Sequence, residues 1–426
     1  MTAPRSLIAD CVAGYSARLQ AVIGTAHHVA SPLGAWLLLA LVAPASSGTD
    51  RDVLTEVLGC DTDTAAQAAA ELLADPHPVV ASAAALWASS GAEFSPAFGR
   101  WRAALPPQVT VGDPPGQAGL DRWAREHTFG LIDQFPIRDD SLYLILASAL
   151  ATKVSWVVPF DVAPGSSLGS ASPWATRLRQ VLRTPRHDGH TQYIAVTPDA
   201  GDVIVHAARA VGGLLVVSVA AAPEVPAGTV LAVAHRIGIQ QATGGIVQRR
   251  ALTDLPLGAG LLWQVREVAA ASEECTAVLP AWSASSNHKL RDPSLGFAAA
   301  KNAIAPGPEP WQAVQSAMAR YSRTGFEAAA VTAMAIEHAV MVSGRRREAE
   351  LRFAHPYAVV AIASDPEGAG QGEGARAGNG PWHGLPVFSA WVSEPADATD
   401  SGSPGARRGD QRIPGERVAW HRRSRR

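Results

Sequence analysis

The sequence predicts an α+β fold with largely antiparallel sheets. Helical patterns dominate the first part of the chain, and strand patterns then follow with helices between them. The strict alternation of strand and helix that is typical of parallel βαβ proteins is absent, which favours antiparallel pairing. Apolar residues make up 47% of the 426 residues, so the chain can bury a sizeable core as one large domain or two ordinary ones.

Residues 31–42 predict a buried helix. Ser31 is a preferred N-cap residue, and Pro32 fits the first helical position because its missing N–H would have no partner there. The most apolar run of the chain, residues 33–45, is shorter than the roughly 20 residues that a membrane span needs. We therefore expect a core helix and no contact with a membrane.

Further elements follow from two amphipathic and five apolar segments. Residues 49–59 begin at Thr49, a suitable cap, and carry apolar residues at helical spacing before Gly59. Residues 119–135 show a similar helical pattern. Strands are expected from five segments: residues 141–156, 201–222, 275–282, 357–364 and 385–393.

Two polar segments are expected to lack regular structure. Residues 365–381 are rich in glycine and lie between two strand patterns, which is typical of a long flexible hairpin loop. Residues 396–426 are polar and basic with few apolar side chains, so we expect a disordered basic tail.

Composition narrows the classes of partner. The net charge of −2 at pH 7 gives no sign of nucleic acid or an anionic membrane as partner. Cys11, Cys60 and Cys275 are scattered without a CxxC pair, which argues against a zinc knot, a redox pair and a disulfide framework. The N-terminus lacks a long apolar segment and a clear cleavage site, so the sequence predicts a cytoplasmic protein.

Catalytic motifs are weak. His187, Asp188 and His190 could supply metal ligands but lack a convincing third position, so a polar turn is the better interpretation. Ser286 and Lys289 have the spacing of a nucleophile pair without its companion motifs. A hydrolase would need a Ser-His-Asp or Ser-His-Glu site that no motif indicates. We expect no catalytic residue, metal or cofactor, and therefore no enzyme.

The stretch GFEAAAVTA at residues 325–333 is unusual because small residues precede the arginine cluster at residues 345–347. As a strand it would place alternate side chains on two faces. One face would carry Phe326, Ala328, Ala330, Thr332, Met334 and Ile336. The other would carry Glu327, Ala329, Val331, Ala333, Ala335 and Glu337. The first face could enter a core and the second could face water, although an exposed alanine-rich helix is the alternative.

Several segments, in order along residues 20–395, resemble those of the serpin family. Residues 31–59 resemble its Ser-Pro central helix and the Gly-x-Thr turn that follows, and residues 120–132 resemble its helix across the main sheet. Residues 142–161 resemble its central strand, and residues 289–297 a later strand-and-helix passage. The matching motif residues are Trp156, Pro159, Phe160, Asp161, Phe353, Pro356, Tyr357, Phe388 and Pro395.

The resemblance implies one serpin-like domain at residues 1–395, with three mostly antiparallel sheets, about eight or nine helices and an exposed reactive-centre loop. The loop's hinge would consist of Gly325, Phe326, Glu327, Ala328, Ala329, Ala330, Val331 and Thr332. It implies a suicide inhibitor of a serine protease, whose cleaved loop inserts into the main sheet. The alternative is a non-inhibitory serpin-fold substrate or binding protein.

Departures from the family pattern motivate that alternative. Phe326 stands where the hinge usually has Thr or Ser, and overpacking a closed site costs roughly 1–3 kcal/mol. A usual Glu–Lys pair is replaced by Arg323 and Ala281. Ser148, Trp156 and Gln315 are the positions at the top of the main sheet that correspond to the family's lock on sheet opening. Ser148 and Gln315 replace the polar residues that the family usually has there.

The scissile bond has two candidates. Counting forward from Gly325 places it near Ala339–Val340, which suits an elastase-like protease. Counting back from Phe353 places it near Arg345–Arg346, which suits a trypsin-like protease. Arg345, Arg346 and Arg347 have no evident partner and are expected in the exposed loop. We also expect a monomer, and the resemblance leaves an extracellular location as the alternative.

Overall fold

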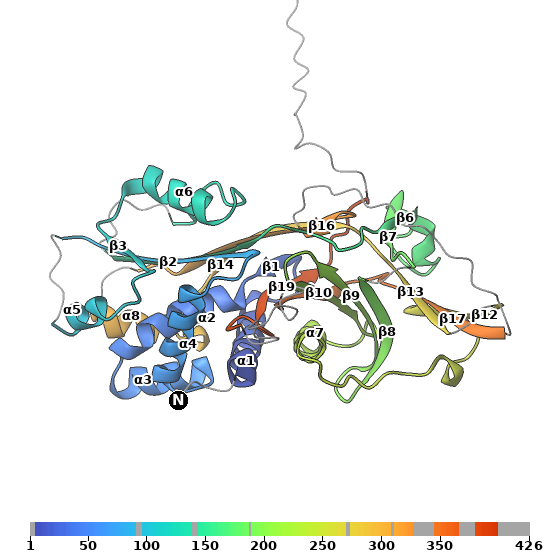
Figure 1. The fold of residues 1–426 in the computed structure, drawn as a ribbon, viewed down its shortest axis with the longest axis horizontal. Coiled ribbons are helices and arrows are strands. Elements are labelled where there is room, and N and C mark those ends of the chain that lie inside the picture. Colours follow the sequence, from blue (N-terminus) through green and yellow to red (C-terminus); the bar gives the residue numbers. More distant parts are fainter. Residues whose placement is uncertain are drawn as a thin grey trace, which may run out of the picture.

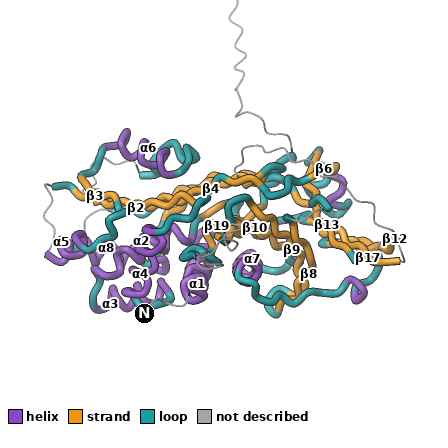
Figure 2. Tube along the Cα trace, in the orientation of Figure 1, coloured by secondary structure: helices purple, strands orange, loops and turns teal. Residues whose placement is uncertain are grey.

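The computed structural model describes residues 5–90, 96–137, 144–186, 189–269, 273–307, 311–326, 345–365 and 380–398. In this part of the chain the fold is α+β. Most helices gather at one end of the molecule, and strands extend toward the other (Figure 2). The predicted fold class is confirmed.

The largest sheet is divided into two halves. One half has the strand order β14 (Trp282–Lys289), β15 (Val314–Tyr321), β16 (Gly325–Phe326) and β5 (Val154–Ser155), and the other has β3 (Thr110–Gly112), β2 (Val80–Ala88) and β4 (Leu144–Thr152). Only Lys153 separates β4 from β5, so the halves share one long strand. The four hydrogen-bonded sheets of the described chain therefore correspond to the three that were predicted.

Helix α2 (Pro32–Val42) lies against one face of this sheet, and α6 (Gly116–His127) lies over the other (Figure 1). Every residue of α2 is buried, as predicted, with Leu37 and Leu38 only 0% and 9% exposed. The Ser31 side chain accepts a hydrogen bond from the Gly34 N–H, and Pro32 opens the helix. Gly34 permits the close approach of β4, because an added Cβ would lie 3.3 Å from the Leu150 Cδ1.

Two helix ends differ from the sequence expectation. Helix α3 (Gly48–Leu58) begins after Ser47 rather than Thr49, and it ends, as expected, at Gly59 with a left-handed φ of 74°. Helix α6 ends at His127, because the Thr128 hydroxyl returns to the Ala124 carbonyl and the chain then turns. The other helices are α1 (Arg5–Ile23), α4 (Thr62–Ala74), α5 (Pro96–Ala103), α7 (Ala227–Ala242) and α8 (Phe297–Ile304). Short 3-10 turns occupy Ala43–Ala45, Gly165–Leu168, Leu252–Asp254 and Pro293–Leu295.

The other two sheets contain the remaining strands. The central sheet has the order β1-β19-β18-β10-β9-β8, and α7 packs on it. Its strands are β1 (His28–Ala30), β8 (His190–Thr197), β9 (Gly201–Ala210), β10 (Leu214–Ala220), β18 (Tyr357–Ala363) and β19 (Pro386–Val392). The third sheet consists of β6 (Asp161–Pro164), β7 (Gln180–Arg183), β11 (Gly258–Ala259), β12 (Trp263–Ala269), β13 (Glu274–Leu279) and β17 (Arg345–Arg352).

Residues near the predicted tail contact the folded domain. The Ala396 N–H donates to the Ala281 carbonyl, and the Asp397 carboxylate accepts from the Arg179 and Gln180 N–H groups. The folded chain thus continues beyond the predicted boundary at residue 395. Residues 366–379, in the expected glycine-rich hairpin loop, lie outside the described residues, although β18 and β19 pair as antiparallel neighbours. None of the described helices has the length and apolar character of a membrane span.

Candidate strand-insertion site

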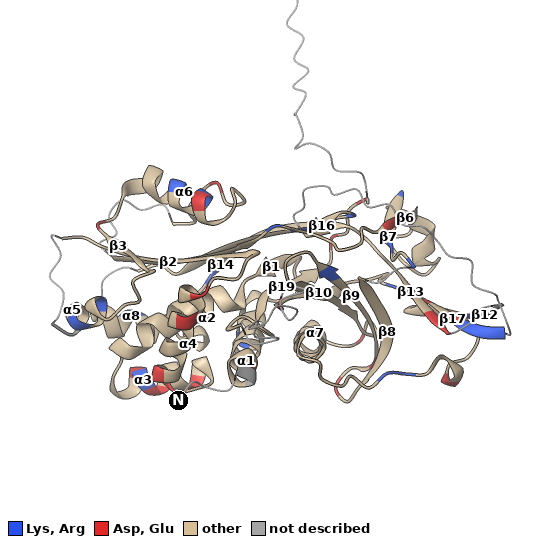
Figure 3. Cartoon of the chain, viewed as in Figure 1, with Lys and Arg blue, Asp and Glu red and all other residues tan. Residues whose placement is uncertain are grey.

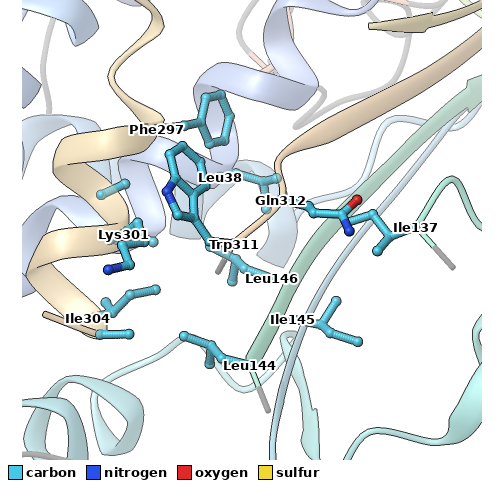
Figure 4. A pocket seen from close by; sticks show the side chains of 13 residues that line it. Leu38, Ile137, Leu144, Ile145, Leu146, Phe297, Lys301, Ile304, Trp311 and Gln312 are labelled. Atoms are coloured by element: carbon cyan, nitrogen blue, oxygen red, sulfur yellow. The ribbon is translucent and has the colours of Figure 1, made fainter. Parts of the chain in front are cut away.

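An open slot lies between β4 and β15. Strand β4 is the edge of its half of the main sheet, and β15 pairs with β14 on one side but with β16 only through Tyr321 and Phe326. A cavity of about 70 Å³ lies between the two strands, bounded by α2 and by the chain around α6. It adjoins a second cavity of about 100 Å³ beside α8 (Figure 4). We call the two ends of this slot the β16 end and the α8 end.

Within the described residues, the side chains of β4 border an unfilled strand position. Ile145, Ala147 and Ala149 point toward α6 and are buried with Trp123. The alternate residues Leu144, Leu146 and Ser148 point toward α2 and are only half-buried. A strand buries its side chains against neighbours on both sides. Among the described residues, no strand lies beside these three on the slot side.

Two polar side chains hold the edges of the slot to the start of α2. Gln315 of β15 is bound at both ends of its amide: its Oε1 accepts from the Ser31 N–H at 2.9 Å, and its Nε2 donates to the Ser31 carbonyl at 2.8 Å. The Ser148 hydroxyl of β4 donates to the Gly34 carbonyl at 2.8 Å. The two predicted lock residues therefore meet at the same helix terminus, and each strand is anchored to α2 separately.

Phe326 closes the β16 end of the slot. Its backbone pairs with Val154 on one side and with Tyr321 on the other, and its side chain is 3% exposed. The ring packs edge-on against Trp282 and Tyr321, with centroid distances of 6.2 and 6.5 Å. The sequence argument treated Phe326 as an obstacle that would have to enter a closed site. The structure shows instead a site that already contains this ring.

Trp156, the third predicted sheet-top position, fastens the segment that leads into β16. Its N–H donates to the Thr324 carbonyl at 3.0 Å, and its indole N–H donates to the Ser322 carbonyl at 2.9 Å. Arg323 donates through Nε to the Phe160 carbonyl at 3.0 Å and accepts from the Phe160 N–H. Arg323 therefore has a backbone partner at Phe160.

A buried chain of hydrogen bonds lies beneath the β16 end, and the sequence analysis missed it. His190 Nε2 is 2.7 Å from the Val158 carbonyl, so it must be the donor. In neutral His190 the Nδ1 then accepts from His206 Nε2 at 3.0 Å, which leaves His206 Nδ1 to accept from the Tyr321 hydroxyl at 3.5 Å. From the sequence, His190 was considered only as a metal ligand and was not connected with His206 or Tyr321. These residues come together through the pairing of β8 with β9 and the packing of β15.

Burial keeps these histidines neutral. His206 is fully buried, and desolvation lowers its pKa well below the ordinary value, with a smaller effect of neighbouring His190. Desolvation also lowers the pKa of His190, although its bond to Val158 partly opposes the shift. A proton on either ring would disturb the donor order of the chain.

The remaining hinge and cleavage candidates are placed only in part. Glu327, Ala328, Ala329, Ala330, Val331, Thr332, Ala339 and Val340 lie outside the described residues. Arg345 and Arg346 begin β17, opposite Ala269 and Val268 of β12, at the end of the molecule far from α6 (Figure 3). A protease needs an extended substrate with free backbone groups, so this placement disfavours cleavage at Arg345–Arg346 in the intact protein.

The expectation that the arginine cluster has no partner was wrong for two of its members. Arg347 Nη1 donates to the carbonyls of Leu252, Thr253 and Leu255. Arg345, which is largely exposed, lies 3.6 Å from a carboxylate oxygen of Glu267.

The weak catalytic motifs do not assemble into a site within the described residues. Ser286 Oγ accepts from the Val29 N–H, and its neighbour His288 lies 2.7 Å from the Val29 carbonyl, so both side chains join β14 to β1. His187 and Asp188 lie outside the described residues. In the described chain no three His, Cys, Asp or Glu side chains are close enough together to hold a metal ion.

Solved structures share this architecture, whereas no family model and no curated protein matches the sequence. Tengpin, a thermophilic serpin in its native state, aligns with a TM-score of 0.63 and 12% identity over 92% of this chain and 95% of its own. Cleaved Serpin 42Da aligns with a TM-score of 0.61 and 13% identity over 94% and 100%. Human thyroxine-binding globulin, with thyroxine bound, gives 0.60 and 12% over 91% and 98%.

These similarities define the class of fold. This chain has the serpin fold over more than nine-tenths of its length. In this fold β16 lies between β15 and β5, at one end of the slot. The fold leaves the activity open, because the similar structures include a cleaved serpin and a thyroxine complex.

Proposed function

We propose that this protein inhibits a serine protease by insertion of its cleaved reactive-centre loop into the slot. The protease serine attacks the scissile carbonyl, the acyl-enzyme forms, and the new amino terminus leaves. The loop then continues from Phe326 into the slot and distorts the protease before water can hydrolyse the ester. This protein supplies no catalytic group. An elastase-like target is favoured, because Arg345 and Arg346 already pair in β17.

The single observation that carries the proposal is the register of β16. Phe326 lies between Val154 and Tyr321 with antiparallel pairing on both sides. A strand that continued in this register would place Thr332 between Ser148 and Gln315. Met334 would then lie beside Leu146, and Ile336 would lie between Leu144 and Trp311.

In this register, the polar residue of the loop would meet polar residues of the slot, and the large apolar residues would meet an apolar lining. The polar Thr332 would reach the polar anchors at the start of α2, where Gly34 and Ser31 line the floor. Ala328 and Ala330 would cross the packed region before them without large side chains. The large apolar Met334 and Ile336 would arrive at the α8 end, whose lining is mostly apolar. Apolar burial contributes roughly 1.5–3 kcal/mol for each large side chain.

Strand addition supplies the second part of the driving force. Along the slot β4 is an edge strand, and an added strand would pair its free backbone groups. Insertion of a serpin reactive loop is itself a recognised example of such strand addition. Each new backbone hydrogen bond contributes about 0.5–1.5 kcal/mol.

The second candidate is a non-inhibitory substrate or binding protein. It is favoured by the separate anchoring of β4 and β15 to α2, because this arrangement holds the slot open without a strand in it. An inserted strand would then release less stored energy. A thyroxine-bound protein of the same fold gives a parallel for a binding role.

Incubation with an elastase-like and a trypsin-like protease, followed by denaturing electrophoresis, separates the two candidates. Inhibition gives a covalent band at the summed mass, whereas a substrate gives only the cleaved chain. Thr332→Arg should abolish the band and leave cleavage intact, because it would place a charge against the floor of the slot. Glu327→Arg is the matched control, since in the same register this side chain would lie beside the exposed Lys153, on the face away from α2, and should keep the band.

A further inference from the structure

We propose that the cavity at the α8 end of the slot binds a small hydrophobic carboxylate. The cavity has a volume of about 100 Å³ and is open on one side. Its walls come from α2, α8, β4 and the segment before β15. Figure 4 shows α8 presenting Lys301 and Ile304 on one side, with Leu144 and Ile145 of β4 on another.

The lining fits an apolar tail. Leu38, Leu146, Phe297, Ile304 and Trp311 all contribute surface to the cavity. Leu146 and Trp311 are half-buried, so a ligand would remove apolar surface from water. A dry apolar cavity of roughly 150 Å³ can hold benzene. The α8 cavity by itself is smaller than this, but together with the adjoining 70 Å³ cavity it offers a comparable space, so it suits a short or medium alkyl chain that extends along the slot.

The charge at the mouth fits an anionic head group. Lys301, in the last turn of α8, is half-buried and donates through Nζ to the Gly307 carbonyl, which leaves two N–H donors for a ligand. Of the described residues that line the cavity it alone carries a charge. A second cation is close by, because the Arg291 guanidinium lies 5.0 Å from the centroid of the Trp311 ring. The exposed amide of Gln312 adds a donor at the same cavity. Cations beside an apolar pocket are suited to a carboxylate that carries a hydrocarbon tail.

Occupation of the cavity would regulate the slot, a consequence that rests on the proposed function. The continued register of β16 places Met334 and Ile336 at the α8 end, beside Leu144 and Leu146. A ligand tail would fill the same space. The loop would then insert only in part, and the bound carboxylate would convert the inhibitor into a substrate.

Calorimetric titration of the full chain with decanoate tests the site. We expect one decanoate per chain, with weaker binding of decanol, which has the same tail without the charge. Lys301→Gln should weaken decanoate binding about tenfold, the lower range for a hydrogen bond to a charged group, and leave decanol unchanged. Lys153→Gln, at the other end of β4, is the matched control and should bind decanoate like the wild type.

A cavity-filling variant gives an independent readout. Ala300 is buried on α8 and lines the cavity, so Ala300→Leu should occupy it, keep or raise the Tm, and reduce binding of both decanoate and decanol. If this variant does not fold, Lys301→Gln still decides the question. No binding to the wild type, or equal binding to the wild type and Lys301→Gln, overturns the proposal.

The regulatory step is tested with the covalent protease band. Saturating decanoate should lower the yield of that band in the wild type but not in Ala300→Leu, which no longer binds it. A decanoate-bound wild type with an unchanged band would reject the regulatory step alone. Absence of any band without decanoate would reject the proposed function, while the titration would still establish the site.

Discussion

The two ends of the slot differ in packing, although they belong to the same pair of strands. At the β16 end, Phe326 is buried between Val154 and Tyr321, and hydrogen bonds of Trp156 fasten the preceding turn. At the α8 end, Leu144 and Leu146 are half-buried beside an open cavity. The comparison shows a strand that has begun at one end and has space at the other. Under the proposed function, insertion from this state would be propagation and would need no new opening at the hinge.

The largest expected effect is the response to cleavage. If the cut loop fills the α8 end, the protein gains backbone hydrogen bonds and buries Met334 and Ile336. We expect the Tm of the cleaved protein to exceed that of the intact one by about 10 °C, since several such contributions sum over a chain of this size. Scanning calorimetry before and after limited proteolysis measures the shift. An unchanged Tm would mean that the α8 end does not receive the loop.

The second prediction compares single residues at the two ends. Phe326→Ala should lower the free energy of unfolding by about 3 kcal/mol, as expected for a buried aromatic ring that leaves a cavity. Leu146→Ala should lower the free energy of unfolding by only about 1 kcal/mol, because the Leu146 side chain is half-buried and lines a cavity that already exists. Urea denaturation of both variants measures the difference, with Phe326→Leu as a conservative control. Equal losses of stability in Phe326→Ala and Leu146→Ala would show that the two ends of the slot do not differ in packing.

The middle of the slot gives the third prediction. Gln315 makes two hydrogen bonds to the Ser31 backbone and Ser148 makes one to Gly34. Removal of a hydrogen bond costs about 1 kcal/mol, so Gln315→Ala should destabilise the intact protein by about 2 kcal/mol and Ser148→Ala by about 1. The same denaturation experiment tests the order. A larger effect of Ser148→Ala would show that β4, rather than β15, depends on the start of α2.

The smallest predicted effect is the part of the pH dependence that comes from His206 at the β16 end. The pKa of His206 is lowered on folding, so the unfolded chain binds the proton more tightly. The contribution of the neutral ring to stability is therefore complete above the unfolded pKa of about 6.5 and is lost as the pH falls below it. The Tm should fall between pH 7.5 and pH 5, and less steeply in His206→Gln. An equal slope in the wild type and in His206→Gln would show that His206 does not contribute to the pH dependence.

Much of the framework followed from local sequence patterns. The N-cap Ser31 with Pro32 correctly located α2, and the alternating or apolar segments correctly located β4 and β18. The end of α6 was misplaced, because the helical pattern continues beyond His127 while the Thr128 side chain returns to the backbone. The alternation around Phe326 was enough to suggest an insertable strand, but not to show where that strand begins.

The sequence by itself determined the positions of α2, β4 and β18, because side-chain periodicity and capping residues act over a few neighbouring positions. Only the tertiary structure decided that Phe326 is already buried, that Gln315 and Ser148 bind the same helix terminus, and that His190 and His206 share a proton-donor chain. These features depend on pairing between distant segments. Strand register and the packing of α2 against β4 and β15 set them, and neither is encoded in any one stretch of residues.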